Sequence, residues 1–283
     1  MEAGRWLTSL WAICLELKEL RSVQLQLSEP PVAASFVIEQ SNLYNSANCP
    51  TSAGNHFQLT TNKMNKVNEI YEILLEHFGP QGWWPGDTPF EVMVGAVLTQ
   101  NTNWVNVSKA IGNLKREDLL SFEKLHDLPV ELLAEKIKPA GYFNLKAARL
   151  KNLLNFIGDE YFGSLEEMFG EDALNLREKI LTVKGIGPET ADSILLYAGN
   201  IPVFVVDTYT HRIFCRHNVI AEEDGYYEIQ EHFTLSLEED VELFNEYHAL
   251  IVRLGKEFCK KSKPLCSQCP LNDFEGFTYT LDA

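Results

Sequence analysis

Residues 181–212 read LTVKGIGPETADSILLYAGNIPVFVVDTYTHR, and this stretch decides the fold. Gly185 and Gly187 allow a tight turn and a close approach of the backbone to a ligand. Pro188 suits the first position of a helix. Small or apolar residues then recur at helical spacing, at Ala191, Ile194, Leu195 and Ala198. The free N–H groups at the start of such a helix suit a phosphate. Because a lone carboxylate, Asp207, follows this turn and helix, the pattern indicates chemistry on a nucleic-acid strand.

Helical periodicity continues through most of the chain from Lys66 onward. One apolar face consists of Val67, Ile70, Tyr71, Leu74, Leu75 and Phe78, and a second consists of Phe90, Val94, Val97 and Leu98. Few segments alternate in the manner of strands. The sequence therefore predicts an all-α protein.

Several ordered motifs resemble the helix-hairpin-helix, Gly/Pro-loop, Asp superfamily of DNA glycosylases, which includes endonuclease III. The hairpin corresponds to residues 183–187, the Gly/Pro loop to residues 199–202, and the family's catalytic aspartate to Asp207. Residues 89–102 resemble the helix that carries the family's strand-penetrating glutamine, here Gln100. Residues 141–147 resemble a further shared loop. The resemblance covers residues 66–270.

The resemblance implies a two-lobed fold with a cleft between the lobes and Asp207 at its mouth. A six-helix barrel would occupy residues 87–203, and a lobe of terminal helices would combine residues 64–86 with residues 204–283. Residues 1–63 would then be a non-catalytic extension, disordered or spurious, since residues 28–62 are rich in Ser, Asn, Thr and Pro. DNA contacts would come from Gly185, Ile186, Gly187 and Gln100.

Glu189 departs from the bifunctional members of this family. Those members place a lysine two residues after the second hairpin glycine, where its amine attacks the sugar. A carboxylate cannot form the Schiff base of lyase chemistry. Lys184 lies on the other side of the turn. The sequence therefore favours a glycosylase without lyase activity.

The cysteines near the C-terminus form a second departure. Endonuclease III-like proteins hold an iron–sulfur cluster with Cys-x6-Cys-x2-Cys-x5-Cys, and this chain has Cys259, Cys266 and Cys269 followed by Glu275. Four thiolates are the usual ligands of a [4Fe-4S] cluster. Three interpretations stay open: a cluster with an atypical fourth ligand, a zinc site completed from elsewhere, or cysteines that bind no cofactor.

Aromatic residues near the first barrel helix resemble the bacterial 3-methyladenine glycosylase branch. That branch lines its base pocket with residues matching Trp83, Trp84, Pro85, Trp104 and Glu189. An N-alkylated purine carries a positive charge, and tryptophan faces attract cations by about 0.5–2 kcal/mol. The expected substrate is therefore an alkylated purine that has been flipped out of the duplex.

Each candidate residue also has an ordinary structural interpretation. Asp207 can serve as the N-cap of the following helix, and Gln100 can be a simple helix-end residue. The tryptophans at 83 and 84 can pack a helix start, and Trp104 can seal the core. For the histidines His211, His217 and His248 we expect structural roles only.

The composition narrows the expected partners. The net charge of -16 argues against indiscriminate nucleic-acid binding. However, no Lys or Arg occurs between Arg216 and Arg253, so much of the acidity lies in one segment that can face away from DNA. Basic residues flank Tyr142 and Phe143 and cluster near the cysteines. The expected partner is duplex DNA containing a damaged base, bound by a monomer.

The six cysteines do not form a secreted disulfide framework. No apolar run is long enough to span a membrane. We expect a cytoplasmic, bacterial protein that associates with the nucleoid when it binds DNA. The alternatives are an endonuclease III-type enzyme acting on oxidised pyrimidines, and a lesion-binding module without catalysis.

Overall fold

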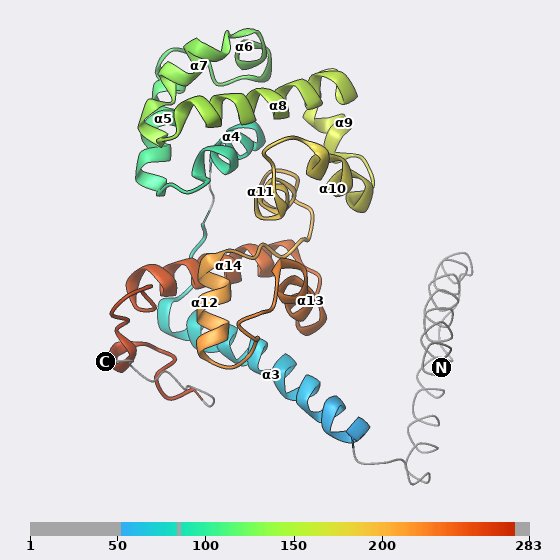
Figure 1. The fold of residues 1–283 in the computed structure, drawn as a ribbon, viewed down its shortest axis with the longest axis vertical. Coiled ribbons are helices and arrows are strands. Elements are labelled where there is room, and N and C mark those ends of the chain that lie inside the picture. Colours follow the sequence, from blue (N-terminus) through green and yellow to red (C-terminus); the bar gives the residue numbers. More distant parts are fainter. Residues whose placement is uncertain (1–51, 84–85, 275–283) are drawn as a thin grey trace, which may run out of the picture. The chain divides into compact units, whose positions relative to one another are not determined.

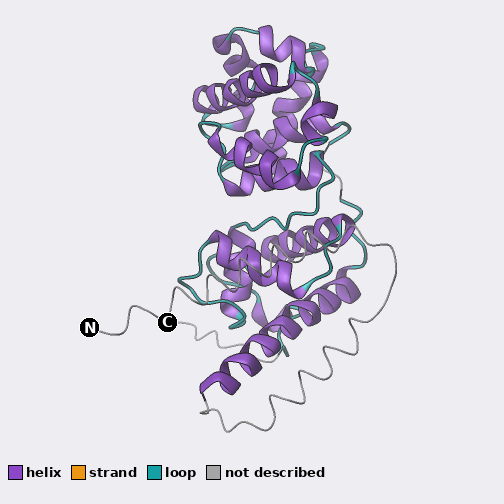
Figure 2. Ribbon diagram, turned by 90° about the vertical axis from the view of Figure 1, so that its right-hand side faces the viewer, coloured by secondary structure: helices purple, strands orange, loops and turns teal. Residues whose placement is uncertain are grey.

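A computed structural model describes residues 52–83 and 86–274. The chain divides into two units, residues 1–56 and 57–283. Every feature discussed below belongs to the second unit, apart from the start of one helix. All regular elements among the described residues are helical, which confirms the predicted all-α class (Figure 2). Among these residues, no helix combines the length and apolar character needed to cross a membrane.

One group of helices carries the hairpin (Figure 1). It consists of α4 (Pro89–Thr99), α5 (Trp104–Arg116), α6 (Phe122–Asp127), α7 (Val130–Lys136), η2 (Lys138–Ala140), α8 (Phe143–Tyr161), α9 (Leu165–Phe169), α10 (Ala173–Thr182), α11 (Pro188–Ser193) and η3 (Ile194–Ala198). Helix α4 packs against α5, α8, α11 and η3. Eight of its 11 residues are buried, as expected for a helix at the centre of the group.

The other group combines helices from both ends of the chain. It consists of α3 (Ser52–Phe78), α12 (Thr208–Arg216), α13 (Tyr226–Ser236), α14 (Val241–Glu257) and the short η4 (Cys266–Gln268). The Tyr247 hydroxyl on α14 donates a hydrogen bond to the Val67 carbonyl on α3 over 2.6 Å. Helix α14 also contacts η3, which connects this group to the hairpin.

The predicted linker at residues 28–62 is partly wrong, because α3 begins at Ser52. Pro50 and Pro80 bracket a stretch without proline, so no residue in it forces a helix to end. Ser, Thr and Asn lower helix propensity by only a few tenths of a kcal/mol each relative to alanine. The rest of the predicted extension, residues 1–51, lies outside the described residues.

A buried ion pair fixes the helices around the hairpin. Asp192 on α11 is fully buried and accepts hydrogen bonds from Arg177 Nε (2.6 Å) and Nη2 (2.9 Å) on α10. Tyr226 and Gln230 on α13 each donate a further bond of 2.7 Å to Asp192 Oδ2. One carboxylate thus connects α10, α11 and α13.

The lowered pKa of buried His217 predicts that the protein loses stability in mild acid. This histidine is buried beside Phe274, and burial, together with the charges of Arg216 and Lys66, lowers its pKa from 6.5 to about 4. The unfolded chain therefore binds a proton between pH 6.5 and about 4 that the folded chain does not. The stability conferred by neutral His217 is complete above pH 6.5 and declines by up to about 3 kcal/mol towards pH 4.

Urea unfolding at several pH values checks this prediction. His217→Gln removes the titrating group, so its unfolding free energy should fall less between neutral pH and mild acid. Equal pH dependence in both proteins would contradict this role of His217.

Candidate active site

The two hairpin glycines differ in what requires them. Gly185 has φ +97°, and a Cβ there would lie 2.4 Å from Arg149 Cγ, so both conformation and space require glycine. Gly187 has an extended backbone, and a Cβ there would meet nothing within 4 Å. The turn therefore requires glycine at position 185 but not at position 187. The side chain of Ile186 is buried in the core, so only its backbone could contact DNA.

Asp207 is the N-cap of α12. Its Oδ1 accepts hydrogen bonds from Thr210 N (2.7 Å) and Thr210 Oγ1 (2.9 Å), and Thr210 Oγ1 in turn accepts from Asp207 N, which completes a capping box. The Asp207 side chain is only 10% exposed. Its second oxygen, Oδ2, lies outside the cap. The capping role is therefore met by one oxygen, and the other takes no part in it.

One side chain, His248, lies beside this second oxygen, and two aromatic side chains pack against that histidine. His248 Nε2 on α14 lies 3.6 Å from Asp207 Oδ2. The other imidazole nitrogen, Nδ1, lies 2.5 Å from the hydroxyl of Tyr197 on η3. The Trp83 ring meets Tyr197 edge-to-face, with 5.3 Å between ring centroids, and lies 6.5 Å from the His248 ring. The site is thus a carboxylate beside a histidine, and Tyr197 and Trp83 contact that histidine in turn.

The same contacts set the ionisation of Asp207. Burial raises the pKa of this carboxyl, but His248 and the two hydrogen bonds from Thr210 lower it more, and the net shift is downward. Asp207 is therefore a carboxylate at neutral pH.

Glu189, in the first turn of α11, interacts with Asp207. Desolvation by the surrounding protein raises the pKa of Glu189, and the negative charge of Asp207 raises it further. His248 lowers this pKa. The residue nevertheless keeps a solvent-accessible surface. A carboxyl group thus occupies the position beside Asp207 where the bifunctional branch has an amine.

Gln100 joins the end of α4 to the hairpin. Its Nε2 donates to the Gly185 carbonyl (3.1 Å) and to Thr190 Oγ1 (3.0 Å), while its Oε1 accepts a hydrogen bond from Arg149 Nη1 (2.5 Å). All three interactions hold the side chain against the protein. A strand-penetrating role would require Gln100 to exchange them for contacts with DNA.

The remaining predicted pocket residues do not all gather at Asp207. Trp104 begins α5, packs over Gly95 and lines a cavity of about 360 Å³ together with Asp87, Glu91 and Lys115. Lys115 Nζ lies 2.6 Å from Asp87 Oδ2 and 2.7 Å from Glu91 Oε2 in this cavity. Trp84 and Pro85 lie outside the described residues.

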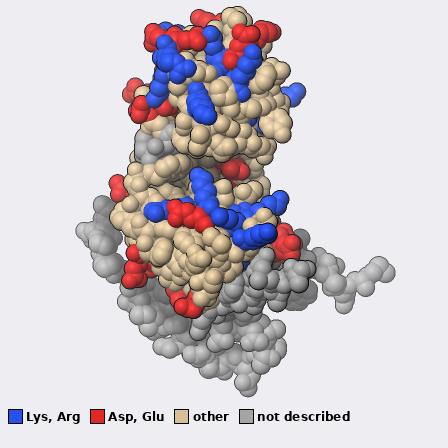
Figure 3. Space-filling model, turned by 90° about the vertical axis from the view of Figure 1, so that its left-hand side faces the viewer, with Lys and Arg blue, Asp and Glu red and all other residues tan. Residues whose placement is uncertain are grey.

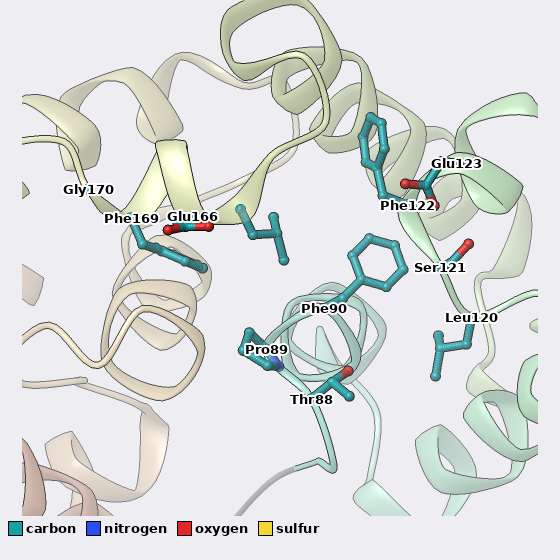
Figure 4. Close-up of a pocket in the computed structure, with 11 residues that line it drawn as sticks. Thr88, Pro89, Phe90, Leu120, Ser121, Phe122, Glu123, Glu166, Phe169 and Gly170 are labelled. Carbon is teal, nitrogen blue, oxygen red and sulfur yellow. The ribbon is translucent and has the colours of Figure 1, made fainter.

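A larger cavity, of about 740 Å³, lies in the hairpin-bearing group of helices, and Asp207 is not among its lining residues (Figure 4). Its walls include Pro89 and Phe90 at the start of α4, Phe122 on α6 and Phe169 on α9. None of the predicted site residues lines it. Its lining is mainly apolar, and Glu123 and Glu166 are the charged residues in it.

The described part of the cysteine motif contains three of the four positions of a cluster site, Cys259, Cys266 and Cys269. Cys259 is buried and its Sγ accepts a hydrogen bond from Arg216 Nη1 over 3.1 Å. Burial, together with the neighbouring Cys259 and Cys266, raises the pKa of the Cys269 thiol to about 11. Within residues 52–83 and 86–274, no three His, Cys, Asp or Glu side chains are arranged to hold a metal ion. Glu275, at the fourth position, lies outside the described residues.

The basic residues near Tyr142 have mixed roles. Lys146 is buried, and its ammonium donates hydrogen bonds of 2.8 Å to the Leu98 and Ala140 carbonyls, so it holds the ends of α4 and η2 together rather than facing a ligand. Tyr142 itself is 71% exposed. Lys and Arg side chains do gather on the face shown in Figure 3, with Asp and Glu side chains among them. That surface is therefore mixed in charge rather than uniformly basic.

Comparison with known proteins identifies the class that this fold and site define. Residues 94–239 match the family described as HhH-GPD superfamily base excision DNA repair protein. A putative DNA repair glycosylase of Methanocaldococcus jannaschii is 52% identical over 215 residues, which cover 75% of this chain and 97% of the relative. The chain therefore belongs to the HhH-GPD superfamily of base excision DNA repair glycosylases.

Two solved structures of DNA glycosylases are also similar to this chain. The H. pylori 3-methyladenine DNA glycosylase MagIII bound to 1,N6-ethenoadenine is 33% identical, with a TM-score of 0.59, and the match covers 69% of this chain and 97% of that one. A trapped endonuclease III–DNA covalent intermediate is 21% identical, with a TM-score of 0.64 and coverage of 74% and 93%. The second similarity concerns the fold alone.

Sequence reasoning assigned His248 a structural role and did not single out Tyr197. The structure brings both to Asp207, from helices that are distant in sequence. No local spacing could have indicated this, because α14 and η3 meet only in the folded chain.

Proposed function

We propose that this protein is a monofunctional DNA glycosylase that removes an alkylated purine, such as 3-methyladenine, from duplex DNA. The observation that carries the proposal is the pair formed by Asp207 and Glu189. The first supplies an ionised carboxylate with one free oxygen, and the second puts a carboxyl where a lyase needs an amine. The 33% identity to a 3-methyladenine glycosylase supports the substrate class.

Hydrolysis would proceed as follows. The bond between the sugar C1′ and the base nitrogen breaks, and the base leaves with the electron pair and loses its positive charge. Positive charge then develops on the sugar, where Asp207 Oδ2 stabilises it. A water oxygen bonds to C1′ and passes its proton to the carboxylate or to solvent. The product is an abasic site.

The flipped base would be held by aromatic rings. Trp83 borders the site through Tyr197 and His248, and its ring face would attract a cationic purine. We include Trp84, Pro85 and Trp104 in this pocket on the strength of the family resemblance. Flipping costs a few kcal/mol and less for a weakened pair, which favours damaged bases.

The DNA contacts would come from the hairpin and Gln100. Gly187 has open space at its Cα and precedes the N-terminus of α11, so a phosphate could approach the backbone there. Gln100 would fill the gap left by the flipped nucleotide after releasing Arg149. We propose that residues 87–203 form the barrel lobe, and that residues 64–86 with 204–283 form the terminal-helix lobe. The working form would be a cytoplasmic monomer.

The cysteine motif has no step in this reaction. Endonuclease III relatives usually carry a [4Fe-4S] cluster, and Cys259, Cys266 and Cys269 are the residues that would contribute ligands here. Any cluster would have a structural role in the terminal-helix lobe.

Borohydride trapping on a duplex with an abasic site tests the missing lyase chemistry. The parent protein should form no covalent adduct, because Glu189 cannot form a Schiff base. Glu189→Lys is the matched comparison, since it places an amine beside Asp207, and it should form adducts. Efficient trapping of the parent protein would refute a monofunctional mechanism and favour the endonuclease III-type alternative.

A further inference from the structure

His248 and Tyr197 take no part in the hydrolysis proposed for this site. His248 is only 8% exposed, and its Nε2 is fully buried without a hydrogen-bond partner among the described residues. A buried polar group without a hydrogen-bond partner destabilises the folded protein. This atom lies 3.6 Å from the free oxygen of Asp207. Such a group beside a proposed catalytic carboxylate requires an explanation.

The contact with Tyr197 determines which imidazole nitrogen carries the proton. Burial raises the pKa of the Tyr197 hydroxyl well above its usual value, so this hydroxyl keeps its proton. A neutral histidine has one donor and one acceptor nitrogen. If Nδ1 carried the proton, a lone pair on Nε2 would face the carboxylate and repel it. The favourable arrangement has the Tyr197 hydroxyl donating to Nδ1 and the Nε2–H directed at Asp207.

We propose that His248 is a positioning residue for Asp207, with Tyr197 fixing its tautomer so that Nε2–H faces Oδ2 and keeps that oxygen ionised and directed at the sugar. This inference rests on the proposed function. The separation is longer than a hydrogen bond, so the interaction is electrostatic: an N–H dipole, or a full positive charge when the imidazole is protonated. In a site largely closed to water, such an interaction is stronger than on the surface.

Asp207 needs this support because burial and a nearby carboxyl oppose its charge, and the favourable hydrogen bonds from Thr210 do not reach Oδ2. Burial disfavours the ionised form, and Glu189 on α11 adds a second carboxyl. Tyr197 on η3 is neutral. Among the titratable groups described around Asp207, His248 is the one that favours the anion. The capping bonds from Thr210 engage only Oδ1.

The pH dependence of single-turnover base release tests the proposal. Activity should be lost on the acid side as Asp207 becomes protonated. In His248→Gln, burial and Glu189 act with less opposition, so this acid limb should move to higher pH by about one unit or more. Tyr197→Phe should shift it in the same direction but less. His211→Gln is the matched control, because His211 lies on α12 and contacts the Glu222 carbonyl; its acid limb should not move.

Two spectroscopic measurements on the protein without DNA separate this proposal from the proposed function. Nitrogen-15 spectra of the imidazole should show a proton on Nε2 of His248. The carbon-13 titration of the Asp207 carboxyl should move to higher pH in His248→Gln. A proton on Nδ1 alone, or an unchanged carboxyl titration, would overturn the role of His248. If both results hold but no duplex releases a base, the proposed function fails and the His248–Asp207 arrangement stands.

Discussion

Replacement of Asp207 by Asn is expected to slow base release by about 10²- to 10⁴-fold. The amide oxygen of Asn can still accept the hydrogen bond from Thr210 N, so the cap of α12 and the fold should persist. The amide carries no charge, so it cannot stabilise the positive sugar. Single-turnover base release and thermal unfolding, measured on the same preparation, check both expectations.

Asp240→Asn provides the matched control. Asp240 is also an N-cap, for α14, and accepts from Leu243 N over 2.7 Å. This variant should retain full activity, because the changed charge lies away from the candidate site. Near-normal turnover by Asp207→Asn would mean that Asp207 serves only as a cap. Such a result would mean that another group stabilises the positive sugar, whereas no base release by the parent protein would favour the lesion-binding module.

Replacement of Asp192 by Asn is expected to lower the free energy of unfolding by about 3 kcal/mol or more. Asp192 is fully buried, and its loss of charge leaves the Arg177 guanidinium, whose side chain is 18% exposed, without a counter-ion. Tyr226 and Gln230 also lose the charged oxygen to which they donate hydrogen bonds. Chemical unfolding at neutral pH measures the effect.

Asp118→Asn is the control for this prediction. Asp118 pairs with Lys124 on the surface, with side chains 94% and 46% exposed. Its loss should cost less than about 1 kcal/mol. Equal costs at the two positions would contradict the role of Asp192 in fixing the hairpin between α10 and α13.

The fold was predictable because its signals are local. The spacing of apolar residues in α3 and α4 gave the buried faces, and the Gly-Ile-Gly turn before Pro188 marked the hairpin. Asp207 could be identified as a candidate because it follows the hairpin at a recognisable place. Thr210, three residues later, donates to Oδ1 of Asp207, so the cap uses one carboxylate oxygen and leaves Oδ2 outside it.

The neighbours of Asp207 could not be predicted in this way. His248 and Tyr197 reach the site from α14 and η3, and their meeting depends on tertiary packing rather than on spacing. Gln100 was predicted as a DNA contact, but its hydrogen bonds to Arg149 and Gly185 depend on how α8 and the hairpin approach α4. Lys146 is one of the basic residues that flank Tyr142 and Phe143 in sequence, yet its ammonium is buried against carbonyls.

The most direct test of the central claim is base release from duplexes carrying 3-methyladenine or a stable analogue, beside duplexes carrying thymine glycol. Each reaction is divided and analysed with and without alkali, which cleaves abasic sites. The proposed function predicts strand breaks in the alkylated duplex after alkali only, and none at thymine glycol. Breaks at thymine glycol without alkali would contradict it and establish an endonuclease III-type activity.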